Sequence, residues 1–449
     1  MNNERIRSRI EPRKEADGGV QVAGWDERIW ESSIFEGLPR RERHSGPYRS
    51  YVPDSLTTTS LLLPPDVDAL VSSAERAVRN SADSRDLEGI ARFLLRSEAI
   101  ASSRIEGVAP STKQVAFAEL ETAEGRGSLG ASEQAQLVAR NMTVVERARA
   151  ELTASDTITL DQVVVLQEAL VADTANACGV RTVQNWIGGS SYHPLGADFV
   201  PPAPQRLNTS LDDLVTYMNG AAHSPIVQAA LVHAQFETLH PFADGNGRVG
   251  RALIHTVLMR RGLTTRAILP ISQVLSTLRQ DYVRALDAYR YTGAPNGDEF
   301  HAARTEWIAF FAQAIIIAAE QVERTKRELD AIRTDWDEQL ALWRTETGHQ
   351  RALRSTSATA RILQDLPSTP VLTTASASRI YEVTTQAANQ GLHMLEGAGI
   401  LSATSRKGQA IYFAPRVLDL VDLSVRRLAS TRFDTRISAP GRGVPAVPQ

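Results

Sequence analysis

The sequence predicts a mainly helical protein with one short β-hairpin in its middle and a small mixed module near its C-terminus. Apolar residues recur at helical spacing over residues 64–107, 130–172 and 211–343. Between Gly179 and Pro204 they alternate with polar residues around Gly188-Gly189, which is typical of a hairpin. Beyond residue 355, three short helical patterns precede two short strand patterns. These observations set the fold class.

The composition is that of a globular chain and not of a disordered or fibrous one. The 449 residues are 42% hydrophobic and 22% charged, which is enough for two or three separate cores. The formal net charge of −3 creates no global positive field for nucleic acid or anionic lipid. The most apolar run, residues 307–319, is interrupted by Gln313 and is shorter than the roughly 20 residues of a membrane span. We therefore expect a buried helix there and no membrane contact.

The cysteine count and the N-terminus indicate a reducing compartment. The single cysteine, Cys178, excludes an internal disulfide and a thiolate cluster for zinc or iron–sulfur binding. The first 19 residues are charged and lack the apolar stretch of a secretory signal. We expect a cytoplasmic protein in which Cys178 is a small buried residue.

The chain divides into six predicted segments. Residues 1–55 are expected to form a partly ordered arm in which Trp25 and Trp30 pack onto the rest of the chain, and residues 427–449 a flexible tail. Between them we predict a helical N-terminal unit (56–110), a catalytic core (111–320), a connecting helix (321–354) and a C-terminal module (355–426).

A glycine-rich turn between two buried helices carries residue types that bind phosphate. Ser224-Pro225 opens the first helix as a capping hydroxyl followed by proline. Gly245 and Gly247 allow the backbone to approach an anion at the start of the second helix, where free N–H groups and the helix dipole favour phosphate. Arg248 and Arg251 are three residues apart, so both guanidinium groups can reach one phosphate chain.

Two more residues of this turn supply the remaining chemistry. The carboxylate of Asp244 is the kind of hard ligand that a phosphate-bound Mg²⁺ takes. His240, with an ordinary pKa near 6.5, is suited to accept a proton from an attacking hydroxyl at neutral pH. Together these residues indicate nucleotidyl or phosphoryl transfer, and they leave open which phosphorus is attacked.

The twelve residues from His240 to Arg251, HPFADGNGRVGR, resemble the signature HxFx[D/E]GNGRxxR of the Fic family at every fixed position. The preceding residues, HAQFETL at 233–239, are also typical of that family. The resemblance implies a Fic-type helical core that transfers AMP from ATP to a Ser, Thr or Tyr hydroxyl of a protein, with attack on the α-phosphorus. It implies these roles: base His240, core anchor Phe242, Mg²⁺ ligand Asp244, α-phosphate hole Gly245, Asn246 and Gly247, and β- and γ-phosphate ligands Arg248 and Arg251.

A second motif lies upstream. The run from Ser102 to Gly107, SSRIEG, resembles the [S/T]xxxE[G/N] inhibitory helix of Fic proteins whose brake is N-terminal to the signature. The resemblance implies that Glu106 pairs with Arg251 and so denies that guanidinium to the γ-phosphate. In some relatives the same glutamate aligns a water that removes AMP, so reversal is a second possible activity.

The predicted hairpin resembles the flap of the family. Its segment Asn185-Trp-Ile187-Gly188-Gly189 would add an extended segment of the target protein as an extra strand and bring its hydroxyl near His240. The three residues that follow carry hydroxyls and are candidates for self-modification: Ser190, Ser191 and Tyr192.

The C-terminal module is similar to winged-helix domains. Helices are expected over 358–366 and 376–383, a third is expected to begin after Thr384 or Thr385, and a hairpin follows at 401–413. The third helix offers Gln386 and Asn389 to base edges but contains no Lys or Arg between residues 384 and 396. Protein contact or homodimerisation is therefore at least as well supported as DNA binding.

Alternatives to the adenylyltransferase stay open at this stage. One is a regulator whose winged helix binds DNA and whose nucleotide pocket only senses its ligand, and another is a Fic enzyme that transfers a different group. His233 and His240 are seven residues apart, which places them near one helical face and would allow a metal pair, but core packing of His233 is the favoured interpretation.

Overall fold

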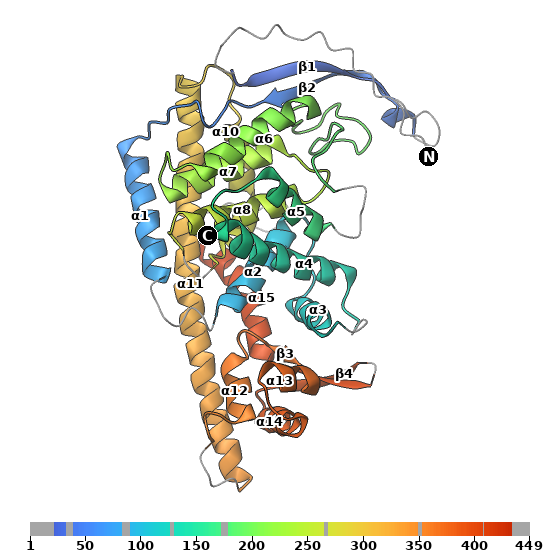
Figure 1. The fold of residues 1–449 in the computed structure, drawn as a ribbon, viewed down its shortest axis with the longest axis vertical. Coiled ribbons are helices and arrows are strands. Elements are labelled where there is room, and N and C mark those ends of the chain that lie inside the picture. Colours follow the sequence, from blue (N-terminus) through green and yellow to red (C-terminus); the bar gives the residue numbers. More distant parts are fainter. Residues whose placement is uncertain are drawn as a thin grey trace, which may run out of the picture. The chain divides into compact units, whose positions relative to one another are not determined.

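The computed structural model describes residues 22–32, 39–82, 90–125, 130–171, 178–264, 268–348, 353–406 and 408–432. Within these ranges the chain is mainly helical, with one two-stranded and one three-stranded sheet, which confirms the predicted fold class (Figure 1). The chain forms two compact units, and neither is continuous in sequence.

The first unit combines the described parts of residues 1–75, 147–263 and 280–313. Its strands are β1 (Gly24–Trp30) and β2 (Gly46–Val52), separated by a 3₁₀ turn at Arg40–Glu42. Its helical elements are the start of α1 (Pro65–Ala82), a π-helical turn at Ala148–Leu152, α5 (Leu160–Leu170), α6 (Pro204–Asn219), α7 (Pro225–Leu239), α8 (Asn246–Arg260), α10 (Arg279–Tyr289) and the first part of α11 (Asp298–Glu346).

The N-terminal arm is a β-hairpin in which β1 and β2 pair antiparallel, from Gly24 opposite Val52 to Trp30 opposite Gly46. The Trp25 ring packs edge-on against Tyr51, with 5.1 Å between the ring centroids, and the Trp30 ring lies 5.4 Å from Trp186. This confirms that both tryptophans pack onto the protein. The first 21 residues of the predicted arm lie outside the described residues.

Helices α7 and α8 form the buried centre of the first unit and lie side by side (Figure 1). All residues of α7 from Ile226 to Leu239 are buried, because the helix carries apolar residues around its whole circumference. Ser224 is the N-cap as predicted, but its side chain makes no capping hydrogen bond. Trp307 of α11 donates a hydrogen bond of 2.8 Å to the carbonyl of Ala230, which joins α11 to α7.

The second unit combines the described parts of residues 76–146, 264–279 and 314–449. Its elements beyond the shared α1 and α11 are α2 (Ala91–Ile105), α3 (Thr112–Glu124), α4 (Glu133–Arg147), α9 (Ile271–Thr277), α12 (Ala358–Asp365), β3 (Val371–Leu372), α13 (Thr374–Ile380), α14 (Thr385–Gly397), β4 (Ser402–Arg406), β5 (Gln409–Phe413) and α15 (Pro415–Arg432).

The C-terminal module has the three helices and the hairpin that the sequence predicts, with Thr384 as the N-cap of α14. Two features are new. The short strand β3 pairs with β5 and makes a third strand, in the order β3-β5-β4. The helix α15 extends to Arg432, into the predicted tail, whose residues from 433 lie outside the described ones. The sheet packs on α3 through an apolar cluster that includes Phe117, Val371 and Ile411.

The apolar run at 307–319 belongs to α11, which is much longer than the predicted connecting helix. It spans 49 residues and includes both segments without a break. Its length and hydropathy would suit a membrane span, yet 61% of the most apolar window is buried inside the protein. Gln313 is exposed, whereas Trp307 and Phe311 are fully buried, so the run is a core helix with one polar edge.

Candidate functional site

The turn between α7 and α8 begins at a strained residue. His240 caps α7 in the left-handed conformation, with φ 46° and ψ 57°, and its N–H donates to the carbonyl of Phe236 at 2.9 Å. This conformation is one that residues other than glycine rarely adopt. Phe242 is fully buried, with its ring 5.8 Å from that of Phe236, as expected of a residue that anchors the turn in the core.

Asn246 closes the turn on itself. Its side-chain oxygen accepts a hydrogen bond of 2.8 Å from the N–H of Phe242, and its side-chain nitrogen donates one of 2.8 Å to the carbonyl of the same residue. The Asn246 side chain thus shapes the turn. Of the two N–H donors of its side-chain amide, one is thus bound to the carbonyl of Phe242.

Gly245 is required by the geometry of the turn. Its φ is +88°, and a Cβ atom there would lie 2.9 Å from Cδ2 of Leu170 on α5. Helix α5 also holds the turn from outside, since Gln167 donates a hydrogen bond of 3.1 Å to the carbonyl of Asp244. Thr159 caps the start of this helix and forms a capping box with Gln162.

The start of α8 is an anion-binding arrangement. The first backbone bond of the helix runs from the N–H of Val249 to the carbonyl of Gly245, so the N–H groups of Asn246, Gly247 and Arg248 precede the helical ladder. These three donors lie at the positive end of the helix dipole. This geometry is compatible with the predicted phosphate site, which stays a prediction.

Arg248 is buried beside this helix start and pairs with Asp244. Its Nη2 lies 3.2 Å from both carboxylate oxygens of Asp244, and the two side chains are 4% and 61% exposed. Among the residues that the structure describes, none accepts a hydrogen bond from its buried Nε or Nη1. Burying a guanidinium whose N–H groups lack acceptors costs free energy, unless a bound anion accepts their hydrogen bonds.

Arg251 and His233 lie at the interface of α7 and α8. Arg251 is 2% exposed. Burial, followed by the charge of Arg251, lowers the pKa of His233 to about 3, so its ring is neutral at pH 7. The Nε2 of His233 is 2.9 Å from the hydroxyl of Tyr282, and its ring stacks on Tyr282 and Trp307. Core packing of His233 is confirmed.

The flap is less regular than the predicted hairpin. Its one internal pairing is an isolated bridge between Ile187 and Phe199, with the N–H of Ile187 donating to the carbonyl of Phe199 at 2.8 Å. Ile187 is 38% exposed, and Gly188 and Gly189 have φ of +74° and +71°. At its base, Val180 bridges to Phe242, so the flap and the turn are joined directly.

Three residues that hold the turn were missed by sequence reasoning. Arg181 Nε and Asn185 Nδ2 both donate to the carbonyl of His240, at 2.9 and 3.2 Å. Gln167 accepts from the N–H of Gly179 at 3.1 Å, which ties the flap to α5. Gln167 is a polar residue inside an otherwise apolar stretch of α5, and this pattern is the sequence signal that could have identified it as a structural contact. Cys178, next to Gly179, is exposed, so the prediction of a buried cysteine was wrong.

The residues of the predicted brake lie in the second unit. Glu106 is the C-cap of α2, its N–H donates to the carbonyl of Ser103 at 3.1 Å, and Gly107 follows with a φ of +81°. Ser102 is buried. The pairing of Glu106 with Arg251 stays a prediction from the sequence.

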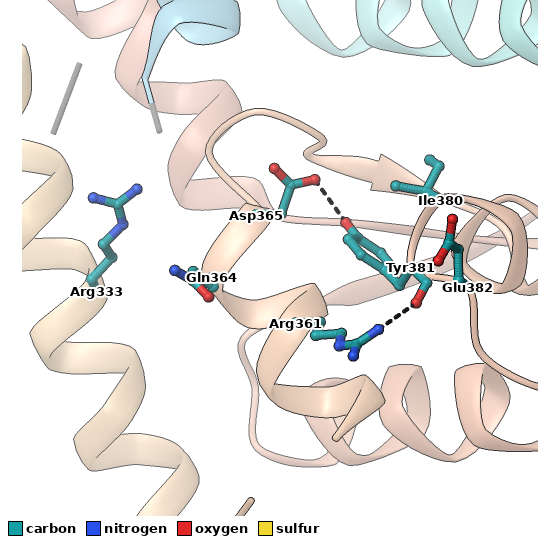
Figure 2. Close-up of a pocket in the computed structure, with 7 residues that line it drawn as sticks. All are labelled: Arg333, Arg361, Gln364, Asp365, Ile380, Tyr381 and Glu382. Atoms are coloured by element: carbon teal, nitrogen blue, oxygen red, sulfur yellow. Dashed lines mark hydrogen bonds between the residues drawn. The ribbon is translucent and has the colours of Figure 1, made fainter. Parts of the chain in front are cut away.

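A separate open hollow of about 380 Å³ lies in the second unit, lined by residues of α11, α12 and α13 (Figure 2). Tyr381 donates a hydrogen bond of 2.9 Å to Asp365, and Arg361 donates one of 2.8 Å to the Tyr381 carbonyl. The two arginines of the lining are balanced by two carboxylates, so the hollow favours neither sign of ion. The turn at the start of α8 is the candidate site.

Comparison with known proteins agrees with this placement. The Fic/DOC family model matches residues 157–258. The protein adenylyltransferase fic-1 of Caenorhabditis briggsae is 33% identical over 119 residues, which cover 25% of this chain and 22% of that protein. The protein adenylyltransferase Fic of Nematostella vectensis is 32% identical over 113 residues, or 24% of each chain. The chain thus spans about a quarter of the length of these curated relatives.

Among solved structures, a Fic family protein from Desulfovibrio desulfuricans G20 aligns with a TM-score of 0.48 and 18% identity, covering 80% of this chain and 98% of that one. The family match runs from just before α5 to the end of α8 and so includes the whole turn and the flap. Residues 157–258 of the chain therefore match a Fic/DOC domain.

Proposed function

We propose that this chain is a protein adenylyltransferase, which transfers AMP from ATP to a Ser, Thr or Tyr hydroxyl of a protein. Its support is the complete Fic signature at residues 240–251, together with relatives of about 30% identity that are named protein adenylyltransferases. These relatives match only about a quarter of this chain, so they do not indicate which protein is the acceptor.

The observation that carries the proposal is the open guanidinium of Arg248. The Nε and Nη1 atoms are buried without a described partner, next to the N–H groups that begin α8. A polyphosphate chain would accept hydrogen bonds from both the Arg248 guanidinium and the backbone N–H groups. Arg251, one turn further along the same helix, adds a second buried guanidinium for that chain.

The proposed reaction follows from the resemblance of residues 240–251 to the Fic signature, which implies attack on the α-phosphorus. The oxygen of the acceptor hydroxyl attacks the α-phosphorus of ATP and forms the new phosphorus–oxygen bond, while the bond from that phosphorus to the oxygen bridging to the β-phosphate breaks. His240 takes the hydroxyl proton as general base, and pyrophosphate leaves. The N–H groups at the start of α8 stabilise the negative charge that develops on the α-phosphate oxygens.

Asp244 fits the role of a Mg²⁺ ligand, because its carboxylate is 61% exposed and lies at the same turn as the open donors of Arg248. Bound Mg²⁺ would offset phosphate charge. The carboxylate is now paired with Arg248, so we expect Asp244 to exchange part of this ion pair for the metal when nucleotide binds.

Inhibition, removal of AMP, docking of the acceptor and self-modification are proposed from motifs in the sequence. Glu106, with Ser102, is proposed to restrain transfer by pairing with Arg251, and removal of AMP is a second proposed activity of the same glutamate. The segment Ile187 to Gly189 is proposed to dock an extended segment of the acceptor; the exposed side chain of Ile187 is compatible with that role. Self-modification on the flap is proposed for Ser190, whose hydroxyl now donates to Glu42.

The C-terminal module is proposed to bind a protein or a second copy of the chain in preference to DNA. Arg406, at the end of β4, donates to the carbonyl of Gly130 at 2.9 Å and lies over the Phe117 ring. The positive charge of this residue is therefore already engaged within the second unit. The exposed face of α14 offers uncharged groups, including Gln386 and Asn389. Retention of random duplex DNA in a filter-binding test at moderate salt would contradict this.

Intact-mass measurement tests the main proposal. The Glu106→Gly protein is incubated with ATP and Mg²⁺, and its mass is expected to rise by the increment of one AMP for each event. Parallel reactions with ATP labelled on the α- or the γ-phosphate should transfer only the α label, to the chain itself or to proteins of a cell lysate. Transfer of the γ label would replace the proposal with phosphoryl transfer, and transfer of neither label would refute it.

A further inference from the structure

The catalytic histidine has a backbone conformation that something must hold in place. His240 is not a glycine, yet it sits at the left-handed end of α7 with φ 46°. Helices that end in this conformation usually place glycine there, and another residue is strained by roughly 1–2 kcal/mol. Such strain persists only where the surroundings fix the residue. The fixing groups therefore decide where the imidazole points.

Those groups come from the flap. The His240 carbonyl accepts hydrogen bonds from Arg181 Nε at 2.9 Å and from Asn185 Nδ2 at 3.2 Å. Arg181 also reaches the carbonyl of Leu239 at 3.4 Å, and its own N–H donates to the carbonyl of Pro241 at 2.8 Å. Two side chains thus hold the backbone on both sides of the histidine.

The environment of Arg181 is unusual for a buried cation. The side chain is 5% exposed and also donates to the carbonyls of Val183 at 3.1 Å and Pro202 at 2.6 Å. Within the part of the chain that the structure describes, no carboxylate forms an ion pair with it. Burial lowers the pKa of Arg181 to about 10, so the guanidinium stays charged at pH 7. A charge surrounded by carbonyls alone is a poor source of stability, and its placement of those carbonyls is the better explanation.

We propose that Arg181, assisted by Asn185, is a positioning residue for adenylyl transfer, which sets the direction of the His240 imidazole through the His240 carbonyl. The proposal rests on the proposed function, in which His240 is the base. It also couples the two parts of the site, because the same guanidinium binds the backbone of the flap at Val183 and the backbone of the turn at His240.

The test compares two arginines of the first unit whose side chains bind backbone carbonyls. Arg260, at the other end of α8, donates to the carbonyls of Leu152, Ser155 and Asp156 and does not contact the turn. Arg181→Lys and Arg260→Lys both keep the positive charge but lose the planar guanidinium, whose fixed set of N–H donors can bind several carbonyls at once. In the Glu106→Gly background, Arg181→Lys should lower kcat for AMP transfer about 10- to 100-fold with little change in KM for ATP. Arg260→Lys should change neither.

A second readout separates positioning from a structural role. The ring signal of His240 in a proton–carbon NMR spectrum, assigned by its loss in His240→Gln, should shift in Arg181→Lys and stay in place in Arg260→Lys. Equal kcat in Arg181→Lys and its parent, or an unmoved His240 signal, would overturn the proposal. If Arg181→Lys does not fold, Asn185→Ala gives the same two readouts with a smaller expected change. If the parent itself transfers no AMP, the proposed function fails, and the NMR shift alone decides the positioning.

Discussion

The turn at residues 240–251 and the flap at 180–200 belong to one unit and differ in how their shape is fixed. Asn246 and Arg248 bind groups of the turn itself, and Gln167 and Arg181 hold the turn from outside. The flap has one isolated bridge and a few short-range hydrogen bonds, such as that from Trp186 Nε1 to the carbonyl of Ser190 at 2.6 Å. It also depends on a distant residue, because the hydroxyl of Ser190 binds Glu42, 148 positions away.

The difference also separates two tasks. The turn presents backbone N–H groups and arginines, which suit a nucleotide that is the same in every reaction. The flap presents exposed side chains and glycines, which suit an acceptor whose sequence matters little. Substitutions in the turn should therefore act on nucleotide chemistry, and substitutions in the flap on capture of the acceptor.

The largest effect is expected from His240→Ala. Loss of a general base lowers the rate of a proton-transfer step by about 10²- to 10⁴-fold, and we expect a fall of that size in AMP incorporation from α-labelled ATP in the Glu106→Gly background. The affinity for ATP, measured by calorimetry, should be unchanged because the donors of α8 remain. A matching loss of ATP affinity would show that the base and the phosphate site are not separable.

The next effect concerns the glycine that makes the turn. Gly245→Ala places a Cβ atom 2.9 Å from the buried Leu170 at a φ of +88°. The left-handed backbone and the overpacking together should lower the free energy of unfolding by about 2–5 kcal/mol. Gly179→Ala is the matched control, because its φ is +82° and no described atom lies within 4 Å of its Cβ. Denaturant unfolding should show a clearly smaller loss for Gly179→Ala, and equal losses would contradict the steric argument.

The same contrast explains what the sequence could predict. The glycine-rich turn between two buried helices was predicted because its sequence pattern lies in twelve consecutive residues. The roles of its residues in the reaction stay predictions. The structure adds that the side chain of Asn246 shapes the turn. The start of α14 was predicted to within one residue, at Thr384 or Thr385, because capping is local, and Thr384 is the cap.

Features that depend on distant contacts were not predictable. The roles of Arg181 and Gln167 exist only once the flap, α5 and the turn are brought together. Strand β3 is two residues long and is defined by its pairing with β5, so it has no periodicity of its own. The 49-residue α11 was divided in the prediction because its first part is apolar and its last part is charged, although no helix-breaking residue separates them.

A smaller effect, on protein stability, is expected when the pH is lowered, because His233 at the interface of α7 and α8 is fully buried. The pKa of His233 is about 3 in the folded protein, below its ordinary 6.5, so below pH 6.5 the unfolded chain binds a proton that the folded chain does not. Stability present at pH 7 is therefore lost as the pH falls towards 3, by about 2 kcal/mol between pH 7 and pH 5. Denaturant unfolding of His233→Gln should lose less stability over this range, and equal losses would remove the argument.

The smallest effect is expected in the flap, from two neighbouring glycines. Gly188→Ala and Gly189→Ala both introduce a side chain at positive φ, of +74° and +71°. At Gly188 the new Cβ meets the carboxylate of Asp198, an exposed side chain that can move away. At Gly189 it meets backbone, with the carbonyl oxygen of Gly196 at 2.9 Å. Only the second substitution should displace the backbone of the flap.

Because the flap lies at the surface and can relax, the extra strain in Gly189→Ala should be near the low end for overpacking, about 1 kcal/mol. We expect it to raise KM for a protein acceptor about fivefold over that of Gly188→Ala, with the same ATP affinity in both variants. Steady-state kinetics with a fixed acceptor measures the first quantity and calorimetry the second. A loss of ATP affinity in Gly189→Ala would show that strain in the flap reaches the turn through Val180 and Phe242, and would break the division between the two regions.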